Sequence, residues 1–346
     1  MIATPPLVGY LIVAAVAFAV GTLALPLAHR FGVAQGMIDL PRPGEAQERP
    51  LPRSGGYALY AGFFAGLLAA IVLFPRYPGE WLRLAGLVAG ALLILPVAYL
   101  DDRYRLSPWP QFGMQVAVAL VAVLFTIQID MVRRIELPLL IAVPLTVLWI
   151  VGMINTVNFA DGVDGLAGGV GAIAALTLFL VSVIQGQHSI AALPLALAAA
   201  SLAFLRWNFF PSRLILGTSG ATLIGFLLAV FSIIGGAKIA AALMVMGLPI
   251  ADVASVILYR LLQRRSPFKG GDRAHLHHRL LDLGLTQRQV VYLFYALTAF
   301  LGGLAISLGA AGSERWPGLI PMAVIVVGVL AYVLSKTWRP ARASRR

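Results

Sequence analysis

Long apolar segments alternate with short polar connections along the whole chain. The apolar segments have about the 20-residue length with which a helix crosses a bilayer, and the connections carry the proline and glycine residues typical of turns. The pattern predicts eleven transmembrane helices at residues 7–29, 54–75, 82–100, 109–129, 137–156, 166–185, 188–205, 215–235, 238–259, 290–310 and 317–337. We therefore predict an all-α fold, a polytopic integral membrane protein in which one domain covers residues 1–346.

The composition agrees with this prediction. Hydrophobic residues make up 60% of the chain and charged residues only 12%, whereas soluble domains carry about 25% charged residues. The chain has no cysteine, which excludes disulfide bonds and thiolate metal sites. Its net charge of +12 would by itself suit a nucleic acid, but in a membrane protein the basic residues first report topology. No nucleic-acid partner is therefore predicted.

Basic residues are distributed unevenly between the connections. With the N-terminus outside, all but six of the 26 lysine and arginine residues fall on cytoplasmic segments. The six others are Arg76, Arg83, Arg133, Arg134, Lys238 and Arg315. An odd number of helices then places the arginine-rich C-terminus in the cytoplasm, as the positive-inside rule requires. In a multi-pass protein of the plasma (inner) membrane we expect cytoplasmic loops near residues 30–53, 101–108, 157–165, 206–217 and 260–289.

Two pairs of glycines, Gly62 with Gly66 and Gly86 with Gly90, have the spacing that lets transmembrane helices approach closely. The motif is short and common, so we interpret both pairs as contacts between helices of one chain. A seam between two copies of the chain is the alternative.

Polar residues gather where the predicted helices meet the cytoplasm. The first cluster is Asp101-Asp102-Arg103, at the end of an apolar segment. Adjacent carboxylates suit a hard cation such as Mg²⁺, which takes oxygen ligands and bridges to phosphate, and one of the two could accept a proton instead. The alternative is a group of charges solvated at a helix end.

The second cluster places a polar side chain at every third residue of the segment 155–164. Its members are Asn155, Asn158, Asp161 and Asp164. Glycines follow both aspartates, and glycine lets a ligand or a neighbouring backbone come close. Amides and carboxylates in this arrangement can hold a sugar, a base or a metal ion. Helix capping by Asn and Asp explains one or two of these residues but not all of them.

The third cluster holds three of the five histidines of the chain, His275, His277 and His278, followed by Arg279. Imidazole and guanidinium groups donate hydrogen bonds to phosphate oxygens, and imidazoles also bind metal ions. No carboxylate-rich zinc pattern accompanies these histidines, so phosphate is the favoured ligand.

The fourth cluster is Gly217-Thr218-Ser219-Gly220, at the start of a predicted helix. Backbone N–H groups at a helix N-terminus bind phosphate, and a plain turn at the membrane surface is an equal alternative. Together the four clusters indicate phosphoryl transfer, in which metal ions and positive donors surround phosphate oxygens. One substrate would arrive from the cytosol and the other from the bilayer.

These motifs resemble those of the polyprenyl-phosphate N-acetylhexosamine-1-phosphate transferases, the glycosyltransferase family 4 of integral-membrane enzymes. The resemblance covers nearly the whole chain and is carried, in this order, by residues 101–103, 155–165, 217–225, 266–268 and 275–280. The form of the histidine segment resembles the N-acetylglucosamine branch of the family. The related phospho-N-acetylmuramoyl-pentapeptide transferase branch typically has three consecutive histidines.

The resemblance implies a reaction. A polyprenyl phosphate attacks the β-phosphate of a UDP-N-acetylhexosamine, UMP leaves, and a lipid diphosphate sugar remains that starts a cell-envelope polysaccharide. The implied cofactor is Mg²⁺, with Mn²⁺ as the alternative, and the implied partners are the UDP-sugar, the polyprenyl phosphate and the lipid bilayer. Because members of the family are often dimers, the resemblance also suggests a homodimer, and the sequence itself does not report the oligomeric state.

The resemblance also implies roles for individual residues. The implied metal ligands are Asp101, Asp102 and Asp161. The implied catalytic residues are these three aspartates with His277 and His278. The implied substrate-binding residues are Arg53, Asn155, Asn158, Asp164, Thr218, His275 and Arg279.

Three positions depart from the family pattern. Thr218 stands where the family has a metal-binding aspartate, Gln111 where it has a lysine, and residues 44–47 where it has a basic stretch. The alternative function is therefore a catalytically silent relative that binds polyprenyl phosphate or a UDP-sugar. A transporter is disfavoured because it would need several charged groups within the membrane, whereas Asp252 is an isolated charge within the predicted spans. For Asp252 itself, the favoured role is a bond to a neighbouring helix.

Overall fold

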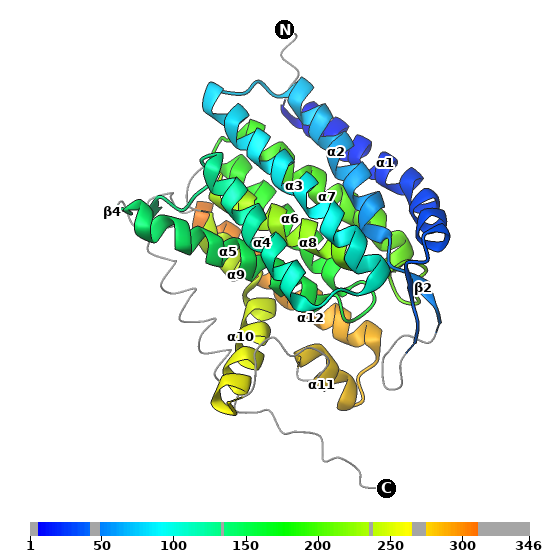
Figure 1. Cartoon of the computed structure of the whole chain (residues 1–346). Coiled ribbons are helices and arrows are strands. Elements are labelled where there is room, and N and C mark those ends of the chain that lie inside the picture. The colour runs from blue at the N-terminus through cyan, green and yellow to red at the C-terminus, as the bar shows by residue number, and fades with distance from the viewer. Residues whose placement is uncertain (1–5, 42–48, 133–134, 235–237, 265–274, 311–346) are drawn as a thin grey trace, which may run out of the picture.

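The structure is a computed structural model that describes residues 6–41, 49–132, 135–234, 238–264 and 275–310. Within these residues most of the chain is helical, and the long helices run side by side in a bundle (Figure 1). Seven described helices are long and apolar enough to cross a membrane, or eight if one bent pair forms a single span. The chain is therefore an all-α polytopic membrane protein, as the apolar pattern predicted.

Ten of the eleven predicted helices have counterparts in the described residues. The helices are α1 (Pro6–Ala34), α2 (Gly55–Leu73), α3 (Pro78–Tyr104), α4 (Pro108–Leu124), α5 (Leu139–Ala160), α6 (Leu166–Ile184), α7 (His188–Asn208), α8 (Gly217–Ile233), α9 (Ile239–Val245), α10 (Gly247–Leu262), α11 (Leu276–Asp282) and α12 (Gln287–Ala310). The eleventh predicted helix, at 317–337, lies outside the described residues. Because α4 and α8 have only 17 residues each, the number of spans stays a prediction.

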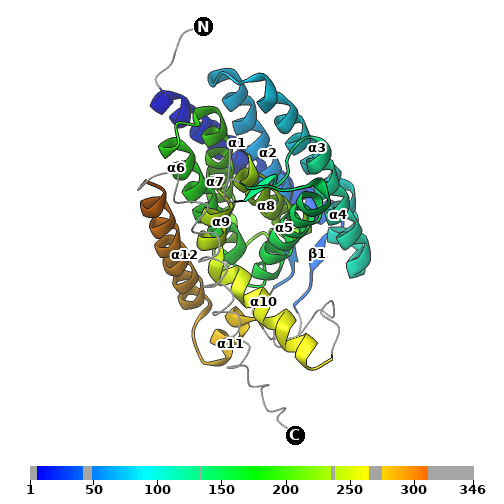
Figure 2. The same ribbon diagram turned by 90° about the vertical axis from the view of Figure 1, so that its left-hand side faces the viewer.

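The single helix predicted at 238–259 is wrong. This segment forms two helices, α9 and α10, whose axes are bent by 76° around Met246. Pro249 lies in the first turn of α10, where its missing N–H is tolerated, but its ring would clash with the carbonyl of Val245 if the helix were continuous. As a result α10 slants across the end of the bundle where α11 lies (Figure 2).

Two short antiparallel hairpins, which the apolar pattern did not predict, interrupt the helices. Strand β1 (Ile38–Asp39) pairs with β2 (Leu51–Pro52), and β3 (Met131–Val132) pairs with β4 (Ile135–Glu136). The first hairpin returns the chain from α1 to α2, and the N–H of Arg53 extends it by donating to the carbonyl of Met37 at 2.8 Å. The hairpin therefore sets where Arg53 enters the bundle.

Helix α8 lies at the centre of the bundle. Every one of its residues is buried, and it packs against α2, α3, α5, α6, α7 and α9. A helix that is apolar on all sides is typical of the interior of a protein. The other helices therefore separate α8 from lipid.

The two glycine pairs lie between helices of the same chain. A Cβ on Gly62 would come within 2.8 Å of the carbonyl oxygen of Ala17 in α1, and a Cβ on Gly90 within 2.4 Å of the ring of Phe226 in α8. The other two glycines also pack against this chain. This confirms the interpretation of the pairs as contacts within the monomer.

Lys238 lies in the turn between α8 and α9, and its side chain is fully buried. The sequence analysis counted it among the basic residues of the outer connections. Its Nζ makes no hydrogen bond within the described residues. Burial penalises the charged form and lowers the pKa of Lys238 to about 7.

We expect Lys238→Met to stabilise the protein, and to do so most at low pH. The unfolded chain keeps the lysine proton up to about pH 10.5, whereas the folded chain releases it at about pH 7, so between these values unfolding takes up a proton. The stability of the wild type should therefore rise with pH over this range. Thermal unfolding in detergent at several pH values measures this slope. The variant should show a smaller slope, and an unchanged slope would contradict the role given to Lys238.

Candidate active site

The N-terminus of α8 meets a buried carboxylate. Asp102, in the last turn of α3, accepts a hydrogen bond from the N–H of Thr218 at 2.7 Å and from the N–H of Ser219 at 3.2 Å. Its side chain has no exposed surface. The first amides of a helix lack partners within the helix, and a negative charge beside them is stabilised by the helix dipole. Asp102 therefore joins α3 to α8.

Asp101 binds the same region through three donors. Its carboxylate accepts hydrogen bonds from the hydroxyl of Thr218, from Nε2 of Gln111 at 2.7 Å and from the N–H of Leu106 at 2.9 Å. Thr218 and Gln111 stand at two of the three positions where the resemblance implied other residues, and both are neutral donors to this carboxylate. The third departure, at residues 44–47, lies outside the described residues.

Arg53 supplies positive charge to the carboxylate pair. Its guanidinium group lies within 4.0 Å of three carboxylates, those of Asp39, Asp101 and Asp102. Asp39 comes from the end of β1 and also pairs with Arg105. Asp39 was not among the predicted site residues, because a single aspartate in a connecting loop has no pattern of polar residues around it.

The backbone after Arg53 lies against the start of α8. The N–H of Ile215 donates to the carbonyl of Pro52, and the N–H of Gly55 donates to the carbonyl of Ile215, both at 2.9 Å. A Cβ on Gly56 would lie 2.2 Å from the nitrogen of Gly220. Only glycine permits this approach, so Gly56 and Gly220 let the segment after Arg53 pack against the start of α8.

Asp161 caps the C-terminus of α5, and its carboxylate makes no hydrogen bond to the described residues. Burial raises the pKa of Asp161 well above its usual value. The positive charge of Arg53 opposes this shift, and the negative charges of Asp102, Asp164 and Asp39 add to it. When ionised, the Asp161 carboxylate therefore lacks a neutralising partner of its own. It lies close to the Arg53 cluster, which consists of Arg53, Asp39, Asp101 and Asp102.

Asp164 ties the same loop to the connection between α7 and α8. Its carboxylate accepts from the N–H of Ser212 at 3.2 Å, and burial raises the pKa of Asp164 while the contact with Ser212 opposes the rise. The N–H of Gly165 donates to the side chain of Asn208 at 2.9 Å, and Asn208 donates to the carbonyl of Leu214 at 3.0 Å. The sequence analysis missed Asn208, which is an isolated amide at a helix end.

The two asparagines of the 155–164 cluster face different helices. Asn155 donates to the side chain of Gln115 in α4 at 2.7 Å and to the carbonyl of Val151 at 2.8 Å. The side chain of Asn158 lies 3.5 Å from the hydroxyl of Thr222 in α8. Asn155 therefore helps to pack α4 on α5, and Asn158 lies closer to the start of α8.

Helix α11 brings the histidine cluster to the loop that begins with Asp161. A Cβ on Gly162 would lie 2.6 Å from Nε2 of His277, so glycine is needed for this approach. His277 is buried, and burial lowers the pKa of His277 well below its usual value, with His278 and His275 adding to the shift. Its imidazole is therefore neutral near pH 7. Arg279 lies two residues, about half a turn, further along α11.

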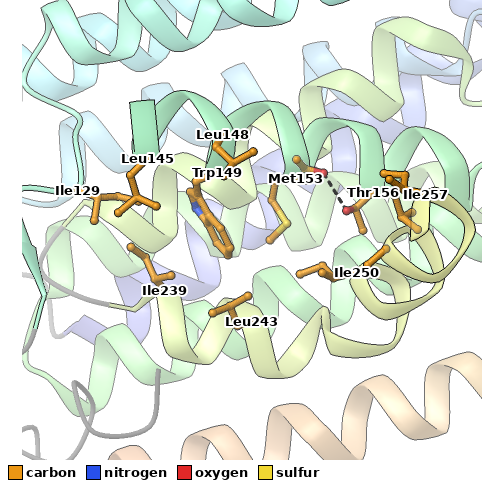
Figure 3. Close-up of a pocket in the computed structure, with 13 residues that line it drawn as sticks. Ile129, Leu145, Leu148, Trp149, Met153, Thr156, Ile239, Leu243, Ile250 and Ile257 are labelled. Carbon is orange, nitrogen blue, oxygen red and sulfur yellow. Dashed lines mark hydrogen bonds between the residues drawn. The ribbon is translucent and has the colours of Figure 1, made fainter. Parts of the chain in front are cut away.

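An apolar groove of about 340 Å³ lies between α5, α9 and α10 (Figure 3). Side chains from all three helices line it, among them Trp149 and Met153 from α5, Leu243 from α9 and Ile250 from α10. The hydroxyl of Thr156 is occupied by a hydrogen bond to a carbonyl of its own helix at 2.8 Å. The groove therefore offers hydrocarbon contacts and almost no hydrogen-bonding groups.

The predicted site residues gather at one end of the bundle, opposite the N-terminus of α1 (Figure 1). One contact set joins Arg53, Asp101, Asp102 and Thr218. A second set joins the loop at 161–165 to His277, and charge interactions of Asp161 connect the two sets. Among the described residues, no group of three or more histidine or carboxylate side chains converges closely enough to hold a metal ion by itself.

Comparison with known proteins agrees with this architecture. Residues 84–236 match the family model described as glycosyl transferase family 4. The chain is 31% identical over 328 residues to the probable undecaprenyl-phosphate N-acetylglucosaminyl 1-phosphate transferase of Bacillus subtilis, covering 90% of this chain and 89% of that relative. It is 33% identical over 355 residues to the decaprenyl-phosphate N-acetylglucosaminephosphotransferase of Mycolicibacterium smegmatis, covering 92% and 84% of the two chains.

A third relative, the undecaprenyl-phosphate alpha-N-acetylglucosaminyl 1-phosphate transferase of Haemophilus influenzae, is 28% identical over 334 residues, which is 90% of each chain. These matches extend over most of the length of both partners, beyond the segment that the family model covers. The chain therefore belongs to glycosyl transferase family 4, which confirms the resemblance drawn from its motifs.

We expect Gly217→Ala to destabilise the protein more than the matched control Gly36→Ala. Both glycines have positive φ, +74° and +68°, which costs an alanine roughly 1–2 kcal/mol. At Gly217 the new Cβ would also lie 2.6 Å from the carbonyl of Arg53 and 2.8 Å from the carboxylate of Asp102, whereas Gly36 has nothing within 4 Å. Thermal unfolding in detergent compares the two variants, and equal shifts would contradict this packing.

Proposed function

We propose that this protein transfers N-acetylhexosamine 1-phosphate, with N-acetylglucosamine as the favoured sugar, from a UDP-sugar to a polyprenyl phosphate. A phosphate oxygen of the lipid attacks the phosphorus that carries the sugar, and the bond from this phosphorus to UMP breaks. UMP leaves with the electron pair, and a lipid diphosphate sugar remains. The names of the relatives, which are polyprenyl-phosphate N-acetylglucosamine phosphate transferases, support both the reaction and the sugar.

The observation that carries this proposal is the continuity between groove and polar site along α5. Trp149 and Met153 line the apolar groove, and Asp161, the C-cap residue of α5, follows about two turns beyond Met153. A polyprenyl chain has no hydrogen-bonding groups and suits such a groove. A lipid bound there would bring its phosphate to the end of α5, beside the Arg53 cluster.

Mg²⁺ suits the balance of charge at this end of the bundle. The carboxylates of Asp39, Asp101, Asp102 and Asp161 are accompanied by the guanidinium groups of Arg53 and Arg105. Mg²⁺ commonly takes one or two carboxylates together with substrate phosphates and water, so it needs no larger protein cage. Asp161 is the proposed ligand because its carboxylate has no other partner among the described residues. Mn²⁺ is the alternative cation.

Asp101 and Asp102 would then act differently from the roles that the resemblance implied. Their oxygens already accept hydrogen bonds from the start of α8 and from Gln111, so they contribute negative charge and hold the site together. A bound cation would neutralise phosphate oxygens of donor and acceptor as they come together. A phosphate monoester has a second pKa of about 6, so the acceptor reaches the site mainly as a dianion and needs no carboxylate to remove a proton.

Positively charged and hydrogen-bonding groups surround the same space. The Nε of Arg53 is buried and faces Asp102 at 3.7 Å, but the Arg53 side chain as a whole keeps 22% of its surface exposed, so the rest of its guanidinium group can donate to a phosphate. His277 is neutral and can donate or accept at the Asp161 loop. Together with His278 and Arg279 of α11, these groups would bind the diphosphate of the UDP-sugar.

The silent alternative rests on neutral residues at positions where the family has charge. Thr218 and Gln111 complete a set of donors around Asp101, so both replaced side chains have hydrogen-bond partners of their own. The proposed cation site at Asp161 does not depend on either residue. We therefore favour an active enzyme.

The proposed topology has eleven spans, with the N-terminus outside, the C-terminus in the cytoplasm and the active site facing the cytoplasm across the plasma (inner) membrane. The start of α1 and the site lie at opposite ends of the bundle (Figure 1), which supports this orientation. The connections richest in arginine belong to the end that carries the site, as the positive-inside rule expects.

Asp161→Asn is expected to lower UMP release by about 10²-fold, the range for loss of a group that stabilises transition-state charge. The assay uses protein in detergent with undecaprenyl phosphate, UDP-N-acetylglucosamine and Mg²⁺. The matched control Asp130→Asn, at an exposed residue between α4 and α5, should keep wild-type activity. Addition of EDTA should stop the reaction. Full activity of Asp161→Asn would refute the cation site, and a wild type that releases no UMP from any UDP-N-acetylhexosamine would favour the silent relative.

Gly152→Phe is expected to raise the KM for undecaprenyl phosphate by about tenfold, because one aromatic ring fills much of a groove that buries a few isoprene units. Gly152 lines the groove and has open space beside it. Gly303→Phe in α12 is the matched control, since Gly303 also has open space but lies away from the groove. The KM for the UDP-sugar should stay constant in both variants. Equal lipid KM values for the two variants would argue against the groove as the polyprenyl site.

A further inference from the structure

Asp252 connects α10 to the histidine segment. Its carboxylate lies 3.0 Å from Nδ1 of His275 and accepts a hydrogen bond from the N–H of Leu276 at 2.7 Å. Asp252 and His275 are both buried. The favoured role in the sequence analysis was a bond to a neighbouring helix, and the structure shows this bond at the first residues of α11. The sequence could not show the partner, because residues 252 and 275 belong to different helices.

The ring of His275 is held on three sides. Phe159 of α5 stacks on it with ring centroids 4.9 Å apart, and His277 stacks on it with centroids 5.7 Å apart and planes only 5° from parallel. Asp252 occupies the edge that carries Nδ1. Within the described residues Nε2 makes no hydrogen bond. Nε2 is therefore the ring atom that can meet a ligand.

A carboxylate can only accept a hydrogen bond, so the nitrogen that faces it must carry the proton. In the neutral form of the His275 ring, Asp252 thereby places the proton on Nδ1 and leaves a lone pair on Nε2. A lone pair requires a donor. Fully ionised phosphate oxygens have no hydrogen to give, whereas the hydroxyl groups and the acetamido N–H of an N-acetylhexosamine do.

We propose that Asp252 is a positioning residue for the donor sugar: it orients His275 and sets its tautomer, so that Nε2 accepts a hydrogen bond from a hydroxyl or acetamido N–H of the sugar. This inference rests on the proposed function, since it requires a sugar nucleotide at the Asp161 loop. It adds a residue from α10, outside the motifs, to the recognition of the sugar.

Helix α10 also forms part of the lipid groove. Ile250, Val253 and Ile257 line the groove, while Asp252 lies between two of them in sequence and binds α11. A substitution that disturbed α10 as a whole would alter the groove and raise the KM for the lipid. A substitution that changed only the tautomer of His275 would act on the UDP-sugar alone, so the two kinds of effect can be separated by kinetics.

Asp252→Asn is the decisive variant because it keeps the shape of the side chain. Its carbonyl oxygen still accepts from the N–H of Leu276, but its amide now donates to Nδ1 of His275 and moves the ring proton to Nε2. We expect kcat/KM for UDP-N-acetylglucosamine to fall by about 10- to 100-fold. This is the loss of activity that typically follows when the partner that orients a functional histidine is removed. The KM for undecaprenyl phosphate should not change. An unchanged kcat/KM, or an equal rise in the lipid KM, would overturn the proposal.

His275→Asn separates positioning from anchoring. The asparagine amide can replace Nδ1 as donor to Asp252 and so keep the anchor of α11, but nothing replaces Nε2. We expect the same loss as in Asp252→Asn, and no further loss when the two changes are combined, because both remove one interaction. Wild-type activity of His275→Asn, or additive losses in the double variant, would show that the pair only anchors the loop.

The tautomer can be measured without any turnover. The chain has only five histidines, so protein with ¹⁵N-labelled histidine in detergent gives few signals, and the spectrum of His275→Asn identifies that of His275. We expect the proton on Nδ1 in the wild type and on Nε2 in Asp252→Asn. A wild-type ring with its proton on Nε2 would refute the inference whether or not the protein is active. A wild type without transferase activity would refute the proposed function. The position of the ring proton would then still decide whether Asp252 sets the tautomer of His275.

Discussion

A helix that is buried along its whole length cannot leave its first amides to water, and in this protein the carboxylate of Asp102 satisfies those of α8. The carboxylate is itself buried, so it needs compensating charge, which the helix dipole and Arg53 supply. The segment after Arg53 is hydrogen-bonded to the residues that precede α8. The contacts that stabilise the start of α8 therefore bring α3 and the first hairpin to this helix. This junction forms the centre of the candidate site.

The rest of the site extends from this junction through charge and through two helices. Asp161 lies close enough for its charge to interact with Arg53 and Asp102, and it has no hydrogen-bond partner among the described residues. The negative charge there exceeds what the protein compensates, which suits a cation and phosphates. Helix α5 runs from the apolar groove to this polar end, and α10 lines the groove while its Asp252 binds the start of α11. A lipid and a sugar nucleotide would therefore meet where hydrocarbon gives way to charge.

At two positions where the resemblance implied charged residues, neutral side chains make the local hydrogen bonds. Thr218 and Gln111 carry no charge, yet each donates to Asp101. A buried carboxylate accepts from hydroxyl and amide donors as well as from charged ones, so the hydrogen-bonding requirement of Asp101 is met. Because both side chains are neutral, they add no charge of their own to the aspartate pair.

Local patterns in the sequence determined most of the helices and the residues that make up the site. Apolar length alone predicted nine single helices that the structure contains and a tenth that it divides into α9 and α10. The aspartate pair, the 155–164 segment and the histidines were recognised by residue type and spacing. The tertiary structure decided the bend at Met246, the burial of Lys238, the use of Asp102 as the cap of α8 and the pairing of Asp252 with His275. These features depend on contacts between residues up to 117 positions apart. The energy of a buried polar group is set by such neighbours, which a local pattern of apolar and polar residues does not specify.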